Sequence, residues 1–167
     1  MSEATIRPAP AADDAALLAI DAATWSAFVS PVPPPPAGAP FFDRGIAPED
    51  VLVAVVDGAV VGYAAIGASI PVPSNAHVMM VRSLAVDPAH RGRGIGRRLT
   101  QAAVAEARAS GARRLRLRVL GPNAAARRLY EACGFVVEGV LREEFLLDGR
   151  YVDDVLMALT LSDEGAQ

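Results

Sequence analysis

The sequence predicts a mixed α/β fold, in which helices pack on one sheet. Segments with strand character alternate with segments whose apolar residues recur at helical spacing, and this mixture is typical of the class. The chain has 167 residues, of which 52% are hydrophobic and 21% charged, as in a globular domain with a substantial core. No apolar stretch approaches the ~20 residues that a membrane-spanning helix needs. We therefore expect one domain and no membrane segment.

The first part of the chain is predicted to hold a short strand, a helix and a proline-rich loop. We expect the strand at residues 5–7 and the helix from residue 13 or 14 to about 26, because an aspartate at either position can cap the first turn. Residues 30–40, SPVPPPPAGAP, cannot form a helix or a central strand because proline lacks an N–H donor. This surface loop is either a stiff connector or, with Phe41 and Phe42, part of a substrate rim.

The middle of the chain is predicted to be a hairpin, a strand, a helix and another strand. The β-branched runs on either side of Asp57-Gly58 predict a hairpin over residues 51–68. Residues 78–86, VMMVRSLAV, are nearly all apolar, as in a strand that is covered on both faces. Residues 97–110 have helical apolar spacing, and residues 113–120 alternate strictly between arginine and apolar side chains, as a strand does.

The last part of the chain is predicted to be a helix followed by a second hairpin. Asn123 to Cys133 has helical spacing, and Gly134 is suited to close the helix. The strands of the hairpin lie on either side of Asp148-Gly149.

The composition excludes several kinds of chemistry. All 16 basic residues are arginine, so neither a Schiff-base lysine nor the lysine of a Walker phosphate loop exists. The single cysteine, Cys133, excludes an intrachain disulfide, and only two histidines accompany it, so we expect no metal site. The start of the chain, MSEATIRPAP, lacks the features of a secretory signal. We therefore expect a cytoplasmic protein.

Positive charge is concentrated in one segment of an otherwise acidic chain. Arg91 to Arg128 contains 11 arginines and one acid, whereas the whole chain has a net charge of −3. Such a segment indicates either a local site for a polyanion or the solvated faces of one helix and one strand. Nucleic-acid binding is disfavoured, because aromatic residues make up only 5% of the chain and none lies among the arginines of 113–120 for base stacking.

The segment begins with a glycine-rich turn, RGRGIG, between the strand of residues 78–86 and the helix of residues 97–110. Such a turn presents backbone N–H groups to an anion at the start of a helix, and glycine lets a phosphate approach without a Cβ in the way. A Rossmann dinucleotide site does not fit, because its G-x-G-x-x-G spacing and its following acid are both missing. The turn is thus suited to cradle a pyrophosphate.

Two linked motifs resemble the GNAT superfamily of acyl-CoA-dependent N-acetyltransferases. Residues 91–96 match its R/Q-x-x-G-x-G/A motif, preceded by LAVDP at residues 84–88, and residues 123–135, NAAARRLYEACGF, resemble its second block, N-x-x-A-x-x-x-Y-x-x-x-G-F. The resemblance extends from Ile6 to Leu161, although its specific part is residues 84–135.

The resemblance implies a fold and a domain organisation. It implies a mostly antiparallel central sheet of about six to seven strands flanked by about four helices. Residues 1–167 would form a single N-acetyltransferase domain, with a proline-rich loop region at 29–49 and a disordered tail at 162–167.

The resemblance also implies that acetyl-CoA is the co-substrate, and it assigns residues to its binding. The pantetheine arm would be held by the backbone of the strand end, the pyrophosphate by the glycine turn, and Asn123 would contact the arm. The implied cofactor-binding residues are Leu84, Ala85, Val86, Arg91, Gly92, Arg93, Gly94, Ile95, Gly96, Arg97 and Asn123.

The implied reaction is direct attack of a primary amine on the thioester. A backbone N–H near Val86 could stabilise the oxyanion, and Tyr130 matches the family's general acid. The strand that often carries a glutamate in this family has none here. His77, Glu143, Glu144 and Asp153 remain candidate bases, and none is assigned.

The acceptor is left open between a small-molecule amine and a peptide N-terminus. The acidic surplus outside the arginine segment favours a cationic amine, contacted by Glu143, Glu144, Asp153 or Asp154. The alternative function is a noncatalytic acyl-CoA-binding regulatory module. The apolar C-terminal hairpin is compatible with a homodimer.

Overall fold

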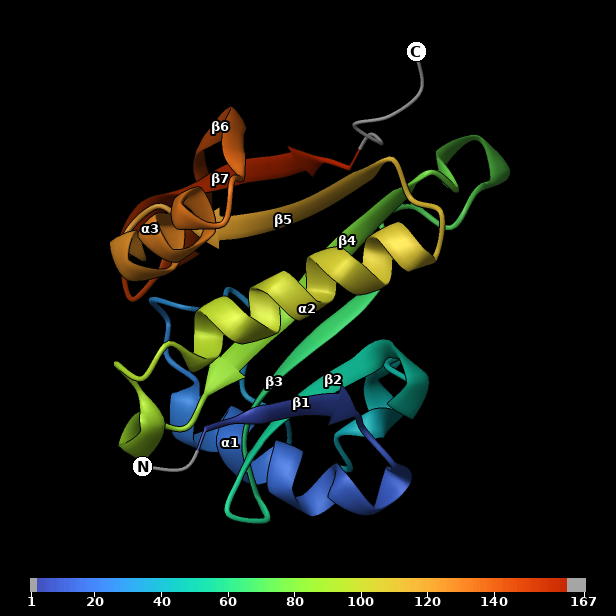
Figure 1. Cartoon of the computed structure of the whole chain (residues 1–167). Coiled ribbons are helices and arrows are strands. Elements are labelled where there is room, and N and C mark those ends of the chain that lie inside the picture. Colours follow the sequence, from blue (N-terminus) through green and yellow to red (C-terminus); the bar gives the residue numbers. More distant parts are fainter. Residues whose placement is uncertain (1–2, 162–167) are drawn as a thin grey trace.

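Seven strands form one sheet in the computed structural model, which describes residues 3–161 (Figure 1). The strand order is β1-β2-β3-β4-β5-β7-β6, and every neighbouring pair is antiparallel except β4 and β5. The strands are β1 (Thr5–Pro8), β2 (Val51–Val56), β3 (Ala59–Ala68), β4 (Val78–Val86), β5 (Arg114–Leu120), β6 (Val136–Leu147) and β7 (Arg150–Thr160). The predicted mixed, mostly antiparallel sheet is confirmed.

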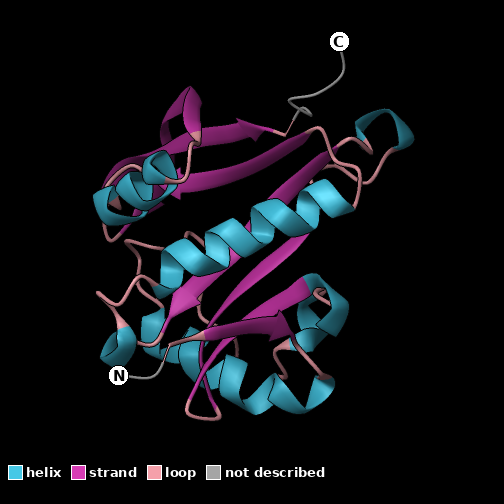
Figure 2. Ribbon diagram, in the orientation of Figure 1, coloured by secondary structure: helices cyan, strands magenta, loops and turns pink. Residues whose placement is uncertain are grey.

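Three α-helices pack on this sheet: α1 (Asp14–Thr24), α2 (Ile95–Ala109) and α3 (Ala124–Ala132). Figure 2 shows α2 lying along the middle of the sheet, with α3 beside it near β5. About four helices were expected. Between α1 and β2 the chain forms only short 3₁₀ turns, because six prolines between residues 31 and 40 prevent a helix there. Among the helices of residues 3–161, none combines the length and the apolar character that a membrane span requires.

Helix α2 is held to the sheet by a row of buried side chains. Leu99, Ala103 and Ala107 are fully buried at intervals of four residues, which places them on one helix face. Gly62 of β3 makes this close approach possible, since a Cβ there would lie 3.2 Å from Leu99 Cδ1. The packing fixes the position at which the first turn of α2 meets the end of β4.

Strand β4 differs from the expectation that both of its faces are covered. Only Val78 and Val81 are buried, although seven of its nine residues are apolar. The reason is that residues from Met80 to Val86 line a cavity. The predicted tail, residues 162–167, lies outside the described residues.

Candidate active site

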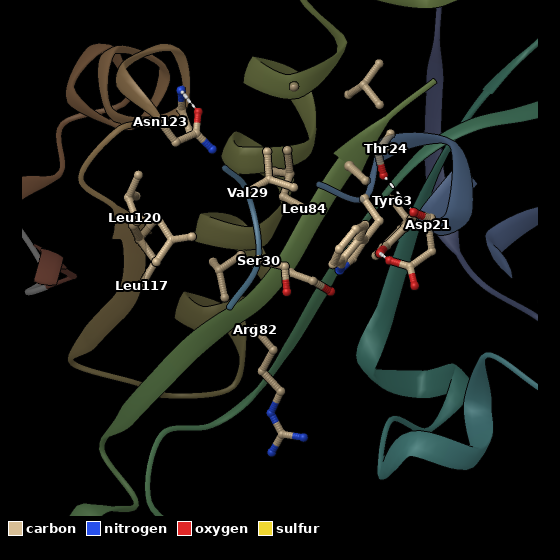
Figure 3. Close-up of a pocket in the computed structure, with 18 of the residues that line it drawn as sticks. Asp21, Thr24, Val29, Ser30, Tyr63, Arg82, Leu84, Leu117, Leu120 and Asn123 are labelled. Carbon is tan, nitrogen blue, oxygen red and sulfur yellow. Dashed lines mark hydrogen bonds between the residues drawn. The ribbon is translucent and has the colours of Figure 1, made fainter. Parts of the chain in front are cut away.

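A cavity of about 1000 Å³ opens where β4 and β5 separate. The two strands pair only from Val78 to Met80 on β4, opposite Arg114 to Arg116 on β5. Strand β4 nevertheless continues to Val86, and β5 continues to Leu120. Their C-terminal ends are therefore free of each other, and Figure 3 shows side chains from both strands, α1 and the start of α3 around the resulting space.

The backbone at the end of β4 faces this cavity. Ala85 pairs with Tyr63 of β3, and the Asp87 N–H donates to the Val61 carbonyl at 2.9 Å. Because successive residues of a strand direct their backbone groups to opposite sides, those of Leu84 and Val86 point away from β3. The Val86 carbonyl accepts a hydrogen bond from Arg91 Nε at 3.3 Å. The N–H groups of Leu84 and Val86 are thus available to a ligand.

The turn between β4 and α2 has the geometry of an anion-binding turn. Gly92 and Gly94 have φ of 74° and 75°, and a Cβ at either would meet nothing within 4 Å. Arg98 N–H makes the first helical bond, to the Gly94 carbonyl at 3.1 Å. The preceding N–H groups have no helical acceptor, and the helix dipole adds to their attraction for negative charge. An open glycine turn with free N–H groups fits a pyrophosphate.

Gly96 serves a different purpose, because it lets α3 approach α2. A Cβ at Gly96 would lie 3.2 Å from Leu129 Cδ2 on α3. Asn123 caps α3, since its Oδ1 accepts the Ala126 N–H at 3.1 Å. In Figure 3 the side-chain amide nitrogen of Asn123, which the cap does not use, points toward the cavity. The contact between the two helices therefore brings Asn123 and the glycine turn to the same site.

Tyr130 lies on α3 and lines the cavity next to Phe135. The two rings meet edge to face, with 5.8 Å between their centroids. Burial raises the pKa of the Tyr130 phenol above its usual value, and nearby Cys133 adds to the increase. The hydroxyl is therefore protonated at neutral pH and able to donate a hydrogen.

Cys133 is half-buried and lies outside the cavity lining. Burial raises the pKa of its thiol, although Arg97 and Thr100 oppose the increase. Because the thiolate is the nucleophilic form, this cysteine is a poor acyl acceptor.

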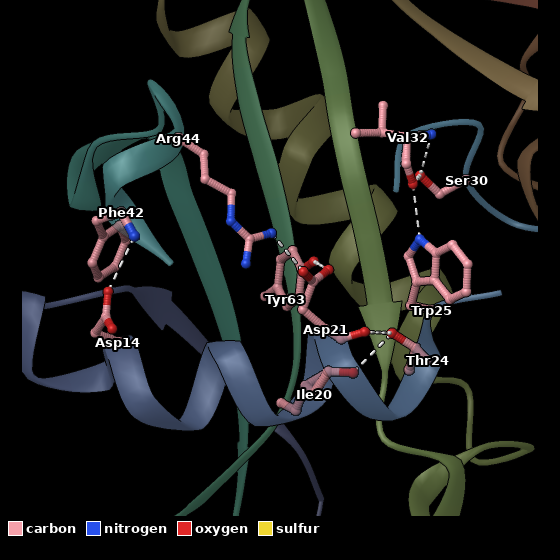
Figure 4. A network of polar contacts seen from close by, with 10 residues as sticks. All are labelled: Asp14, Ile20, Asp21, Thr24, Trp25, Ser30, Val32, Phe42, Arg44 and Tyr63. Atoms are coloured by element: carbon pink, nitrogen blue, oxygen red, sulfur yellow. Dashed lines mark hydrogen bonds and ion pairs between the residues drawn. The ribbon is translucent and has the colours of Figure 1, made fainter. Parts of the chain in front are cut away.

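A polar network at the other side of the cavity joins α1, β3 and the loop after α1 (Figure 4). Tyr63 Oη donates to Asp21 Oδ1 at 2.8 Å, and Arg44 Nη1 donates to Asp21 Oδ2 at 2.6 Å. Burial raises the pKa of Tyr63, and the charge of Asp21 raises it further. All three residues line the cavity, and sequence analysis identified none of them. No local signal could have done so, because 42 residues separate Asp21 from Tyr63.

The structure brings the predicted site residues together with one exception. Tyr130 and all the predicted cofactor-binding residues line the cavity except Arg93. The four candidate bases do not line the cavity: His77, Glu143, Glu144 and Asp153 all lie outside the lining. Asp153 Oδ1 instead accepts the Glu143 N–H at 2.9 Å, which supports an irregular stretch of β6.

Most of the acids expected to contact a cationic acceptor lie outside the cavity lining. Of the four proposed acids, only Asp154 lines the cavity, where it is 1% exposed and forms an ion pair with Arg118. Within residues 3–161, no three His, Cys, Asp or Glu side chains are grouped so as to hold a metal.

Comparison with known proteins identifies similar chains. The profile of the acetyltransferase (GNAT) family matches residues 17–135. The chain is 33% identical over 116 residues to an L-methionine sulfoximine/L-methionine sulfone acetyltransferase of Salmonella typhimurium, covering 70% of this chain and 67% of the relative. It is 32% identical over 123 residues to the L-amino acid N-acyltransferase MnaT of Escherichia coli, covering 74% and 71%. The structure of yncA from Salmonella typhimurium with its cofactor acetyl-CoA superposes with a TM-score of 0.80, at 28% identity over 99% of this chain and 98% of the other.

Proposed function

The chain belongs to the acetyltransferase (GNAT) family and is an acetyl-CoA-dependent N-acetyltransferase, and on that premise we propose which of its residues carry out the transfer. The proposal is supported by one observation above all. The separation of β4 from β5 opens a cavity that is bordered at one end by the glycine turn and along its side by Tyr130.

The glycine turn and the end of β4 hold the co-substrate in this proposal. The free N–H groups at the start of α2 bind the pyrophosphate, and Arg91 and Arg97, which line the same end, supply positive charge. The pantetheine arm lies along the end of β4 in the place of an additional strand, and the unpaired backbone groups of Leu84 and Val86 form hydrogen bonds with it. Asn123 donates its free amide N–H groups to the same arm.

The thioester of acetyl-CoA supplies an acyl group that a neutral amine can attack. A backbone N–H at the end of β4 stabilises the negative charge that develops on the carbonyl oxygen. As the C–N bond forms and the C–S bond breaks, Tyr130, kept protonated by burial, donates its hydrogen to the departing thiolate, and the proton that the amine loses restores the phenol. Because Cys133 is outside the cavity lining, the amine attacks directly, and no acyl group passes through the protein.

The acceptor is a primary amine of a small molecule or of a peptide N-terminus. A small molecule is supported by the two relatives described above, whose names refer to an amino acid or to amino-acid derivatives. We place the reaction in the cytoplasm, because the one cysteine of the sequence forms no disulfide. A homodimer stays a prediction, supported by the exposed apolar side chains of the edge strand β6, such as Val136 and Leu146.

Direct transfer is tested by steady-state kinetics on the purified chain. Thiol release should require both acetyl-CoA and an amine, and the product should carry one acetyl group. Initial-rate lines at several amine concentrations should intersect, as for a ternary complex, and Cys133→Ser should retain wild-type turnover. Parallel lines or an acetylated protein would show a covalent route. Tight binding of acetyl-CoA without transfer to any amine would favour the noncatalytic alternative.

A further inference from the structure

Arg82 is displayed at an irregularity in β4, beside the cavity. Ser83 pairs with Ala65 and Val81 pairs with Ile66, so Arg82 is the extra residue of a β-bulge. Bulges redirect a side chain out of the regular alternation of a strand. Arg82 is exposed and belongs to the cavity lining. In Figure 3 it projects from β4 away from Asn123, and thus away from the end that we assign to the co-substrate.

The surroundings of Arg82 hold its guanidinium in place without neutralising it. Nη1 donates to the Gly45 carbonyl at 3.1 Å, and Nη2 donates to the Ala68 carbonyl at 3.5 Å. A Cβ at Gly67 would come within 2.8 Å of Nε, so the glycine leaves the space that the guanidinium occupies. Both acceptors are neutral, and within residues 3–161 no carboxylate forms an ion pair with Arg82. Since a guanidinium has five N–H donors, further donors remain for a ligand.

The other charges of the cavity away from the glycine turn are already paired. Asp21 forms an ion pair with Arg44 at 2.6 Å, and Asp154 forms one with Arg118. These are the two carboxylates in the lining, and neither is free to bind a cationic acceptor. The unpaired charge on this side is therefore the positive charge of Arg82.

We propose that Arg82 binds a carboxylate on the acceptor, so that the acceptor is a primary amine of the amino-acid class. The Cα atoms of Arg82 and Leu84 are roughly 7 Å apart along the strand. The Arg82 guanidinium lies beside Gly67 and Ala68 of β3. An acceptor held there must therefore extend back along β4 to reach Leu84. A free amino acid carries its amine and its carboxylate on one carbon. The guanidinium can therefore hold the carboxylate while the amine faces the thioester near Leu84 and Val86. This assignment rests on the proposed function, because it places the acceptor in the same cavity.

The test compares matched acceptors in the thiol-release assay. The standard L-amino acids and L-methionine sulfone are screened, with spermidine and an unmodified peptide as other classes. The best amino acid is then compared with its carboxamide and with the amine that lacks the carboxylate. We expect kcat/KM for the amino acid to exceed both by about tenfold or more. Because the carboxamide has the more readily deprotonated amine, such a preference reflects binding of the carboxylate.

Arg82→Gln should raise KM for the amino acid by about 10- to 100-fold, as loss of a charged hydrogen-bonding partner does, and leave KM for the two acceptors that lack a carboxylate within about twofold. Arg82→Lys should be intermediate because it keeps the charge without the planar group. Arg116→Gln, on the adjacent strand β5 and outside the lining, is the matched control and should behave as wild type. Acetyl-CoA affinity should be unchanged in all three variants, and thermal melting should show each of them folded at the assay temperature.

Two results would overturn the assignment and leave the proposed function intact. One is a wild-type preference for spermidine, the peptide or the acceptors that lack the carboxylate. The other is an equal rise of KM for acceptors with and without the carboxylate in Arg82→Gln. Transfer to no acceptor in the screen would overturn both the assignment and the proposed function.

Discussion

Replacing Tyr130 with phenylalanine is expected to lower kcat by about 10²- to 10⁴-fold, the usual contribution of a positioned general acid. The Kd for acetyl-CoA should stay within about twofold of wild type, because the ring still packs on Phe135 and only the hydroxyl is lost. The matched control is Tyr151→Phe, since Tyr151 is 67% exposed and lies outside the cavity lining. Turnover of Tyr130→Phe equal to that of Tyr151→Phe would contradict the role of general acid.

The pH profile supplies a second readout for Tyr130. Burial raises the pKa of the phenol above its ordinary value of about 10. The phenol therefore keeps its proton throughout the neutral and moderately alkaline range. Deprotonation of Tyr130 should therefore cause no fall in kcat below about pH 10. An alkaline fall near neutrality that disappears in Tyr130→Phe would mean that the phenol titrates far lower than its burial implies.

Replacing Gly94 with alanine is expected to weaken acetyl-CoA binding by about tenfold or more, through loss of charged hydrogen bonds at the turn. Gly94 has φ of 75°, where alanine is strained, and its Cβ would occupy the open space through which a phosphate approaches. Gly111 lies just beyond the other end of α2, has φ of 78° and also has nothing within 4 Å of a Cβ.

Gly111→Ala is therefore a control for strain alone. Both variants should lose about 1 to 2 kcal/mol of stability, measured by denaturant unfolding, because both force alanine into the left-handed region. Only Gly94→Ala should bind acetyl-CoA more weakly in a calorimetric titration. Equal affinities in the two variants would mean that the turn does not contact the co-substrate.

The features predicted well from sequence are those that depend on local chemistry. Strand β4 has the predicted bounds, Val78 to Val86, because its apolar run ends at Asp87-Pro88. Gly134 closes its helix with positive φ, as predicted, and Gly111 has the same backbone conformation after α2. Helix α2 begins at Ile95, two residues before the prediction, because the positive φ of Gly94 lets the helix begin directly after it.

The features that sequence analysis missed depend on contacts between distant segments. The bulge at Arg82 arises from the register of β4 against β3, and the cavity arises because β4 pairs with β5 over only three residues. Neither has a local signature. The acidic surplus of the chain suggested a site for a cationic amine, yet tertiary contacts pair Asp154 with Arg118 and leave Arg82 unpaired among the described residues.

The claim that the glycine turn holds the pyrophosphate of acetyl-CoA is tested most directly by titrating the wild-type protein with two thioesters. Acetyl-CoA and acetylpantetheine carry the same acetyl group and the same arm, but only acetyl-CoA has the pyrophosphate and the nucleotide. We predict that acetyl-CoA saturates one site per chain in calorimetry and that acetylpantetheine binds at least about 100-fold more weakly, since several charged hydrogen bonds are missing. Equal affinities for the two would contradict the account, because binding would then owe nothing to the turn.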